Sequence, residues 1–133
     1  MKIIKTMGAL AIVLLLINCS GSNKHIVGQK TTFSVNQTFD AGEVILGEKI
    51  DAEFVIKNTG DFPLVISDVK GGCTCTVVDK PKEPILPGDT YKIKASVKTE
   101  NASAGILSKS VGITANTEPS LTTVIVKALV KNK

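Results

Sequence analysis

The chain has 133 residues, and its 16 basic residues are all lysines, set against 12 acidic residues for a formal net charge of +4. This length fits one domain with a single hydrophobic core. Because arginine is absent and no aromatic side chains are interleaved with the lysines to stack on bases, we do not expect a nucleic-acid partner.

The N-terminal residues are typical of a bacterial export signal. Two lysines precede an apolar run over residues 7–17. The run fits the roughly 7–15 residues of a signal-peptide core and is shorter than the roughly 20 that a membrane-spanning helix needs. It ends in Leu-Ile-Asn-Cys at residues 16–19, which resembles the lipobox of bacterial lipoproteins. We predict a lipoprotein signal peptide over residues 1–18, cleaved before Cys19, with a transmembrane anchor as the alternative.

The number of cysteines supports lipidation of Cys19. Three cysteines in an exported protein leave one without a disulfide partner. If Cys19 carries a thioether-linked lipid, Cys73 and Cys75 remain as an even pair. The sequence therefore predicts a protein of the cell envelope, held to a membrane by lipid on Cys19 and facing the periplasm or the exterior. No cofactor other than this covalent lipid is expected.

A short polar segment separates the predicted lipid from the predicted domain. Residues 19–31 are small and polar at first and lack periodicity, so we expect a flexible tether. Fully extended, it would span at most about 40 Å at roughly 3.3–3.6 Å per residue. The folded domain is expected over residues 32–133.

The predicted domain alternates apolar and polar residues with the period of two that is typical of β-strands. Residues 50–57, 91–98 and 124–130 show this alternation most clearly, and turn-forming residues separate the runs. About seven strands follow Phe33, which predicts an all-β, seven-stranded immunoglobulin-like sandwich, with a small barrel as the alternative. The last strand ends in lysines (Lys127, Lys131, Lys133), a pattern typical of a sheet edge.

Cys73 and Cys75 are the residues of the domain with the most reactive chemistry. On a flat strand, residues two apart lie about 6.6 Å from each other, whereas a disulfide needs Cβ atoms about 3.5–4.5 Å apart. Closing the bond therefore requires a bend, which Gly71-Gly72 favours. A loop this short gives only ~1.6 kcal/mol by the chain-entropy relation, so such a disulfide would be a weak and reducible staple.

Three interpretations of this cysteine pair stay open. The two residues could be thiols or a local disulfide that packs as small hydrophobic groups. They could be a redox or sensing pair, or they could hold a two-coordinate Cu(I) ion between two thiolates. A zinc site made by this domain alone is not expected, because zinc takes four ligands and the domain offers neither histidine nor methionine.

The residues that flank the cysteines match a known pattern. The elements, in chain order, are Phe39-Asp40-Ala41-Gly42, Lys57-Asn58-Thr59-Gly60-Asp61, Pro63-Leu64-Val65-Ile66, Gly71-Gly72-Cys73-Thr74-Cys75-Thr76, Pro87-Gly88, Gly105-Ile106-Leu107 and Asn116. Their order and spacing over residues 33–130 resemble the bacterial family called domain of unknown function fifteen-seventy-three. The resemblance implies an immunoglobulin-like sandwich of the Hydin and major-sperm-protein type, commonly carried by exported lipoproteins. It implies no activity.

No motif in the chain predicts an enzyme. The only histidine, His25, lies in the expected tether, and the carboxylates Asp40, Asp79 and Glu83 stand beside turns, where capping is their ordinary role. We therefore expect a non-catalytic monomer that contacts an unidentified protein of the cell envelope, with strand addition as a physical mode of binding. Thiol redox chemistry or Cu(I) handling by the cysteine pair is the alternative function.

Overall fold

The computed structural model describes residues 28–72 and 76–133. These residues form eight β-strands and no helix, so none of them belongs to a helix that could cross a membrane. The strands are β1 (Phe33–Val35), β2 (Thr38–Ile45), β3 (Lys49–Asn58), β4 (Ile66–Gly71), β5 (Thr76–Val78), β6 (Thr90–Lys98), β7 (Gly105–Ala115) and β8 (Leu121–Lys131).

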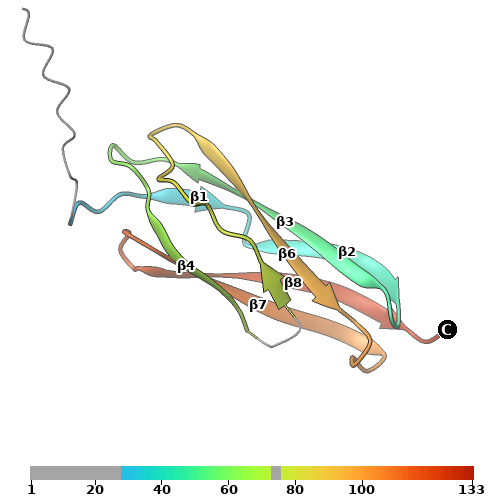
Figure 1. The fold of residues 1–133 in the computed structure, drawn as a ribbon. Coiled ribbons are helices and arrows are strands. Elements are labelled where there is room, and N and C mark those ends of the chain that lie inside the picture. The colour runs from blue at the N-terminus through green and yellow to red at the C-terminus, as the bar shows by residue number, and fades with distance from the viewer. Residues whose placement is uncertain (1–27, 73–75) are drawn as a thin grey trace, which may run out of the picture.

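The strands form two four-stranded sheets that pack face to face (Figure 1). Sheet A has the order β1-β3-β6-β5 and sheet B has the order β2-β8-β7-β4. The predicted all-β, immunoglobulin-like sandwich is confirmed, and the barrel alternative is wrong because the two sheets share no strand. The described residues form eight strands, whereas the sequence indicated about seven. The difference arises because the segment that begins at Phe33 divides into β1 in sheet A and β2 in sheet B.

The alternating sequence pattern becomes the inner and outer faces of the sheets. In β3, every second residue from Ile50 to Asn58 is buried, while the residues between them point toward solvent. β3 pairs with β6 in antiparallel register from Lys49↔Lys98 to Lys57↔Thr90, so buried residues of one strand stand opposite buried residues of the other. A shift of one residue would expose the entire apolar set, which fixes the register.

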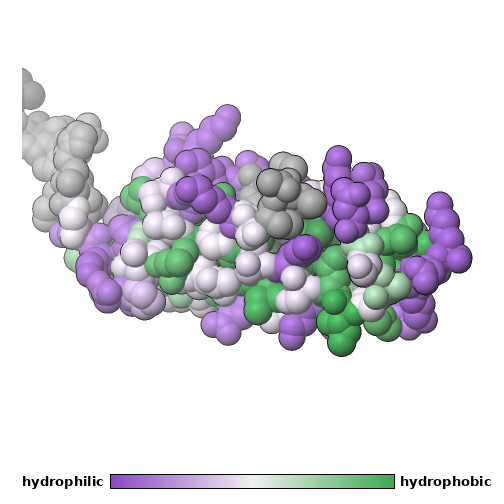
Figure 2. Space-filling model, turned by 90° about the horizontal axis from the view of Figure 1, so that it is seen from below, coloured by the Kyte–Doolittle hydropathy of each residue, from purple (hydrophilic) through white to green (hydrophobic). Residues whose placement is uncertain are grey.

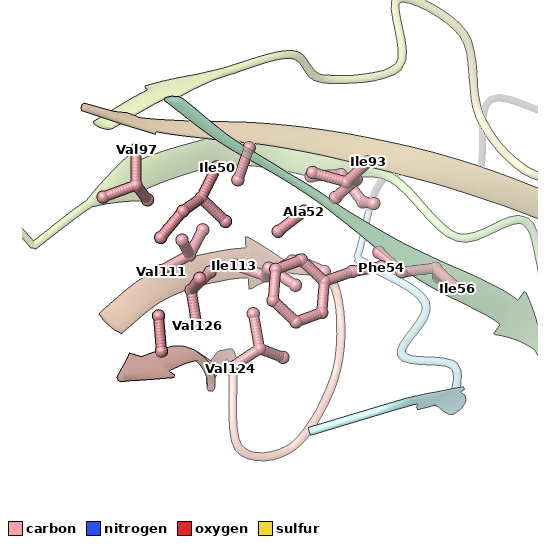
Figure 3. Close-up of a cluster of buried hydrophobic side chains, with 14 of the residues drawn as sticks. Ile50, Ala52, Phe54, Ile56, Ile93, Val97, Val111, Ile113, Val124 and Val126 are labelled. Carbon is pink, nitrogen blue, oxygen red and sulfur yellow. The ribbon is translucent and has the colours of Figure 1, made fainter. Parts of the chain in front are cut away.

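The hydrophobic core lies between the sheets and is almost entirely aliphatic (Figure 3). Its fully buried side chains include Phe54, Ile56, Ile93, Val111, Ile113, Val124 and Val126. Phe39 of β2 contacts Phe54 of β3 edge to face, with ring centroids 6.5 Å apart. This aromatic pair joins the two sheets, because β2 belongs to sheet B and β3 to sheet A.

The C-terminal strand is not a sheet edge, so that prediction is wrong. β8 pairs in parallel with β2 on one side and antiparallel with β7 on the other. Lys127 and Lys131 are exposed because they point away from the core, on the solvent face of sheet B. Lys131 forms an ion pair with Glu43 of β2 at 2.7 Å. Alternating lysines mark a solvent face here, and an internal strand has such a face as readily as an edge strand.

The described chain begins at one end of the sandwich, and the C-terminus lies at the other end. The described chain starts at one end, where the backbone amides of Thr31 and Gly60 donate to the carbonyls of Asn116 and Thr32. We call this the proximal end. At the other end, here called the distal end, the amide of Leu46 donates to the carbonyl of Lys131, and the C-terminus follows (Figure 1).

Candidate functional site

Two asparagines organise the proximal end. Asn58, the last residue of β3, is fully buried although its side chain is polar. Its amide nitrogen donates to the carbonyls of Phe62 (2.8 Å) and Ile85 (2.9 Å). Its side-chain oxygen accepts from the amide of Gly60 (3.0 Å) and from the hydroxyl of Thr31 (3.2 Å). All four positions of the amide group are thus used, as burial of a polar group requires.

Asn116 plays the equivalent part for sheet B. Its side-chain oxygen accepts from the amide of Val65 at 2.7 Å. Its nitrogen donates to the carbonyls of Gln29 (2.9 Å) and Pro63 (3.0 Å). These bonds connect the turn after β7 to the segment before β4 and to the start of the described chain. Sequence reasoning treated both asparagines as turn residues. The only signal for their structural role was their place in the family pattern.

Residues 28–31 were predicted as the end of a flexible tether, and their last residues are bonded to the sandwich. Gln29 and Thr31 bind the two asparagines, and Thr31 is buried. Gly60 has no room for a side chain here, because an added Cβ would lie 2.7 Å from the amide nitrogen of Thr32. Gln29 and Thr31, within the range that the sequence assigned to the tether, are therefore bonded to the sandwich.

The predicted lipidation site and the cysteine pair lie outside the described residues. These are Cys19, with the predicted signal peptide over residues 1–18, and Cys73 with Cys75. The flanks of the pair are described. Gly72 donates its amide to the carbonyl of Ser110 (2.7 Å) beside β7 of sheet B. Thr76 begins β5 and stands opposite Val97 of sheet A.

The cysteine pair thus lies in a segment that joins one sheet to the other. β4 is an edge strand of sheet B and β5 is an edge strand of sheet A, and the two strands contact each other. A Cβ on Gly72 would meet the carbonyl oxygen of Ser110 at 3.1 Å, so the glycine allows a close approach to β7.

The outer face of sheet A is charged and rich in lysine. Five exposed lysines from β3 and β6 share this face with two acidic residues: Lys49, Lys57, Lys92, Lys94, Lys98, Asp51 and Glu53. A surface depression of about 590 Å³ lies over the β3–β6 ladder and extends to Asp79. In it, Asp51 accepts from the hydroxyl of Ser96 (2.6 Å) and pairs with Lys49 (2.9 Å). These two contacts, the Ser96 bond first, lower the pKa of Asp51.

The outer face of sheet B has a different character at its distal end. Ile106 of β7 is 86% exposed and stands opposite Leu129 of β8, which is 40% exposed. Ile45, at the end of β2, is also exposed. Figure 2 shows hydrophobic side chains gathered toward the end of the molecule away from its N-terminal segment. We call Ile45, Ile106 and Leu129 the distal apolar group.

The carboxylates beside turns act as caps where the structure describes their bonds. Asp40 accepts from the amide of Gly42 at 2.8 Å, and Asp79 accepts from the amide of Lys80 at 3.0 Å. Glu48 accepts from the amide of Ile45 at 3.0 Å. Within residues 28–72 and 76–133, no three His, Cys, Asp or Glu side chains gather in a way that could hold a metal ion.

The sequence matches the family described as "Protein of unknown function (DUF1573)" over residues 32–130. The chain belongs to this family. The match covers the whole sandwich, so the family predicted from the motifs is confirmed. None of the curated proteins matches this DUF1573 chain.

Solved structures share the sandwich fold at low sequence identity. A protein of unknown function from Porphyromonas gingivalis W83 superposes with a TM-score of 0.67 and 21% identity, covering 77% of this DUF1573 chain and 48% of that chain. The ASH / PapD-like domain 7 of human CEP192 gives a TM-score of 0.56 and 11% identity over 78% and 88% of the two chains. The secreted serine protease VesC from Vibrio cholerae gives 0.60 and 11% over 77% and 24%.

These similarities carry the fold and nothing further. All three identities lie below the range in which a shared activity follows, and one sandwich fold hosts many unrelated functions. The chain spans about half of the Porphyromonas protein and about a quarter of the protease. The sandwich of this DUF1573 protein therefore has to be interpreted from its own surface.

Proposed function

We propose that this protein is a lipid-anchored module of the cell envelope that acts through protein contacts and has no catalytic activity. Lipid on Cys19 would hold it to a membrane, and the sandwich would face the periplasm or the exterior. In this arrangement the proximal end, where the chain enters the sandwich, is turned toward the membrane. The distal end is turned toward partner proteins.

The distal apolar group is the observation that carries this proposal. A side chain such as Ile106 at 86% exposure gains nothing in the isolated domain, because its apolar surface stays in water. Single exposed aliphatics are ordinary, but neighbouring ones on one face are typical of a binding surface. Ile106 and Leu129 are cross-strand neighbours, and their group lies at the end opposite the one where the chain enters.

One experiment tests both the anchor and the contacts. The intact chain is expressed in a bacterium that carries out lipidation, with a photo-crosslinking residue at position 108, which lies on the outer face beside Lys127. We expect label from radioactive fatty acid on the protein and crosslinked adducts of higher mass after illumination. Cys19→Ser should abolish the label, leave a longer precursor and remove the adducts, because the sandwich then lacks its place at the membrane.

The control places the same crosslinker at position 118, an exposed residue at the proximal end. Far fewer adducts are expected there. A Cys19→Ser protein that is still cleaved and still membrane-bound would disprove the lipoprotein assignment. Equal adduct yields at positions 108 and 118 would disprove a contact surface at the distal end.

The alternative function is thiol redox chemistry or Cu(I) handling by Cys73 and Cys75. Its support is the position of the pair between two edge strands of different sheets, with the close approach of Gly72 to Ser110 on one side. A disulfide in so short a loop would be readily reduced.

Thiol trapping separates this alternative from a structural role. The domain is exported, its free thiols are alkylated, and its mass is measured over a series of glutathione buffers. A redox pair should give oxidised and reduced forms that interconvert at potentials above about −300 mV. A copper site should retain one Cu(I) through gel filtration, and the Cys73→Ser, Cys75→Ser variant should lose it. If neither occurs, and the double variant loses at most ~1.6 kcal/mol of stability, the pair is structural.

A further inference from the structure

We infer that the distal half of the β3 edge is a site where an extended segment of a partner protein adds to sheet A as a strand. This inference rests on the proposed function, because it names where and how a protein contact is made. The edge runs from Lys49 to Glu53, on the side of β3 that faces away from β6. We call it the open β3 edge.

Strand register shows that β1 covers only part of β3. β1 pairs with Ile56, Lys57 and Asn58, and then the chain leaves sheet A to form β2 in sheet B. The next backbone groups along this side of β3 form hydrogen bonds with the side chain of Asn36. Asn36 accepts from the amide of Val55 (2.9 Å) and donates to the carbonyl of Glu53 (3.5 Å). Beyond Asn36, the described residues contribute no further strand to this side of β3.

Backbone alternation decides which groups this edge presents. Odd-numbered residues of β3 direct their backbone groups to this side. The evidence is that Lys57 pairs with β1, and that Val55 and Glu53 bond to the side chain of Asn36. In an antiparallel ladder such groups alternate strictly. The amide of Glu53 and both backbone groups of Asp51 and Lys49 therefore point outward, where an added strand would bond to them.

The edge of β2 in sheet B lies nearby, and the protein blocks it with its own side chains. The carboxylate of Asp40 accepts a hydrogen bond from the amide of Gly42, and the carboxylate of Glu48 accepts one from the amide of Ile45. A register shift between Asp40 and Glu43 also interrupts the strand. Such bulges and inserted carboxylates are common protection against strand pairing. No described side chain caps Asp51 or Lys49 in this way, so the two neighbouring edges differ in a manner that favours β3 for binding.

The apolar side chains beside the open β3 edge are incompletely covered. Nine hydrophobic residues pack against the core while staying partly exposed, and four of them belong to β2 and the turn that follows: Phe39, Ala41, Val44 and Leu46. A strand added beside β3 would lie above this row. Its inward side chains would then complete the burial that the departure of β1 leaves unfinished.

These features define the chemistry of the partner segment. It is extended and runs antiparallel to β3, with apolar side chains at alternate positions that face inward. Its outward position nearest the distal end should carry a carboxylate, because Lys49 stands directly opposite Lys98. Like charges at such a position destabilise a sheet. Among the described residues, Lys98 forms no ion pair. The occupant is therefore an alternating β-segment of another protein with a carboxylate beside Lys49. Its next outward positions would lie beside Asp51 and Glu53 and should carry no further carboxylate.

A pair of variants at one residue tests the hydrogen bonds directly. Asp51→Ala and Asp51→Pro both remove the carboxylate, but only proline removes the outward amide, and its fixed φ is tolerated on an edge. Each is made in the intact lipidated chain with a photo-crosslinking residue at Val55, whose side chain is exposed. Adduct yield should persist in Asp51→Ala and fall at least about fivefold in Asp51→Pro, as loss of a backbone hydrogen bond predicts.

Thermal unfolding of each variant shows whether proline has harmed the fold. If Asp51→Pro does not fold, Glu53→Pro and Glu53→Ala make the same comparison, since the amide of Glu53 faces the same edge. Equal yields from the proline and alanine variants would overturn the inference. So would an adduct of twice the mass of this chain, which would assign the edge to a second copy.

Comparison with the crosslinker at position 108 separates the two levels of the proposal. Adducts at 108 but none at 55 would reject the open β3 edge and leave the proposed function standing. Absence of adducts at both positions would reject the proposed function itself. Adducts at both positions, with proline acting only on those at 55, are the result that we expect.

Discussion

Replacing Phe54 by alanine should unfold the domain at temperatures where the unmodified protein is stable. Phe54 is fully buried at the centre of β3 and contacts Phe39 edge to face across the sandwich. Truncation of a buried phenylalanine costs about 3–5 kcal/mol, part of which is the cavity that remains. A domain of this size has on the order of 5–15 kcal/mol in total. The midpoint of thermal unfolding should therefore fall by on the order of 15 °C or more.

Two controls make this prediction specific. Phe62→Ala removes the same atoms from a side chain that is 37% exposed, so its cost should stay below about 1 kcal/mol. Phe54→Leu keeps most of the volume but loses the aromatic pair, which should cost about 0.5–1.5 kcal/mol. Circular dichroism melts of all three variants give the order. Similar losses for Phe54→Ala and Phe62→Ala would contradict a core centred on Phe54.

The strands that the sequence indicates most clearly are those with one buried face. β3, β6 and β8 each alternate because every second side chain enters the same aliphatic core, and this local pattern survives in any context. The family pattern added the fold type, because it placed these strands and turns in a known order.

The sheet to which each strand belongs could not be read from the pattern. Only Asn36 and Gln37 separate β1 from β2, yet the chain changes sheets there. The internal position of β8 was also missed, because lysines on a solvent face and lysines on an edge give the same alternation. Pairing partners far apart in sequence decide both features. The open β3 edge follows from the same pairing and was therefore invisible to sequence reasoning.

The cysteine pair was the site that the sequence selected, whereas Asn58 is a polar residue that the fold buries completely. An asparagine beside Thr59-Gly60 has the composition of a turn. Its burial depends on Ile85, 27 residues later, and on Thr31, 27 residues earlier. Contacts of this kind arise only when both sheets have assembled, so propensity alone cannot separate a turn asparagine from a buried one.

Replacing Asn58 by alanine should therefore cost far more than the same change at an ordinary turn. Two carbonyls, an amide and a hydroxyl would lose their partner at once. Each buried group left unpaired costs about 1–3 kcal/mol, less where water can reach it, so we expect a loss of about 3 kcal/mol or more in chemical denaturation. Asn36→Ala is the matched control. Asn36 also bonds to backbone groups, but it is exposed, so water can replace it and the loss should stay below about 1 kcal/mol.

Asn58→Asp adds a readout that a simple packing defect would not give. The carboxylate keeps an oxygen for Gly60 and Thr31 but faces the carbonyls of Phe62 and Ile85 without a hydrogen to donate. Burial and these two carbonyls disfavour the charged form, so the pKa of the introduced acid is raised in the folded state. Its protonated form can donate to one of the carbonyls. Relative to the unmodified protein, the variant should therefore be least impaired below about pH 4, near the ordinary pKa of an aspartic acid, and lose stability as the pH rises above that value. A destabilisation that does not change with pH would show that water reaches the side chain of residue 58. That result would contradict its burial between the two sheets.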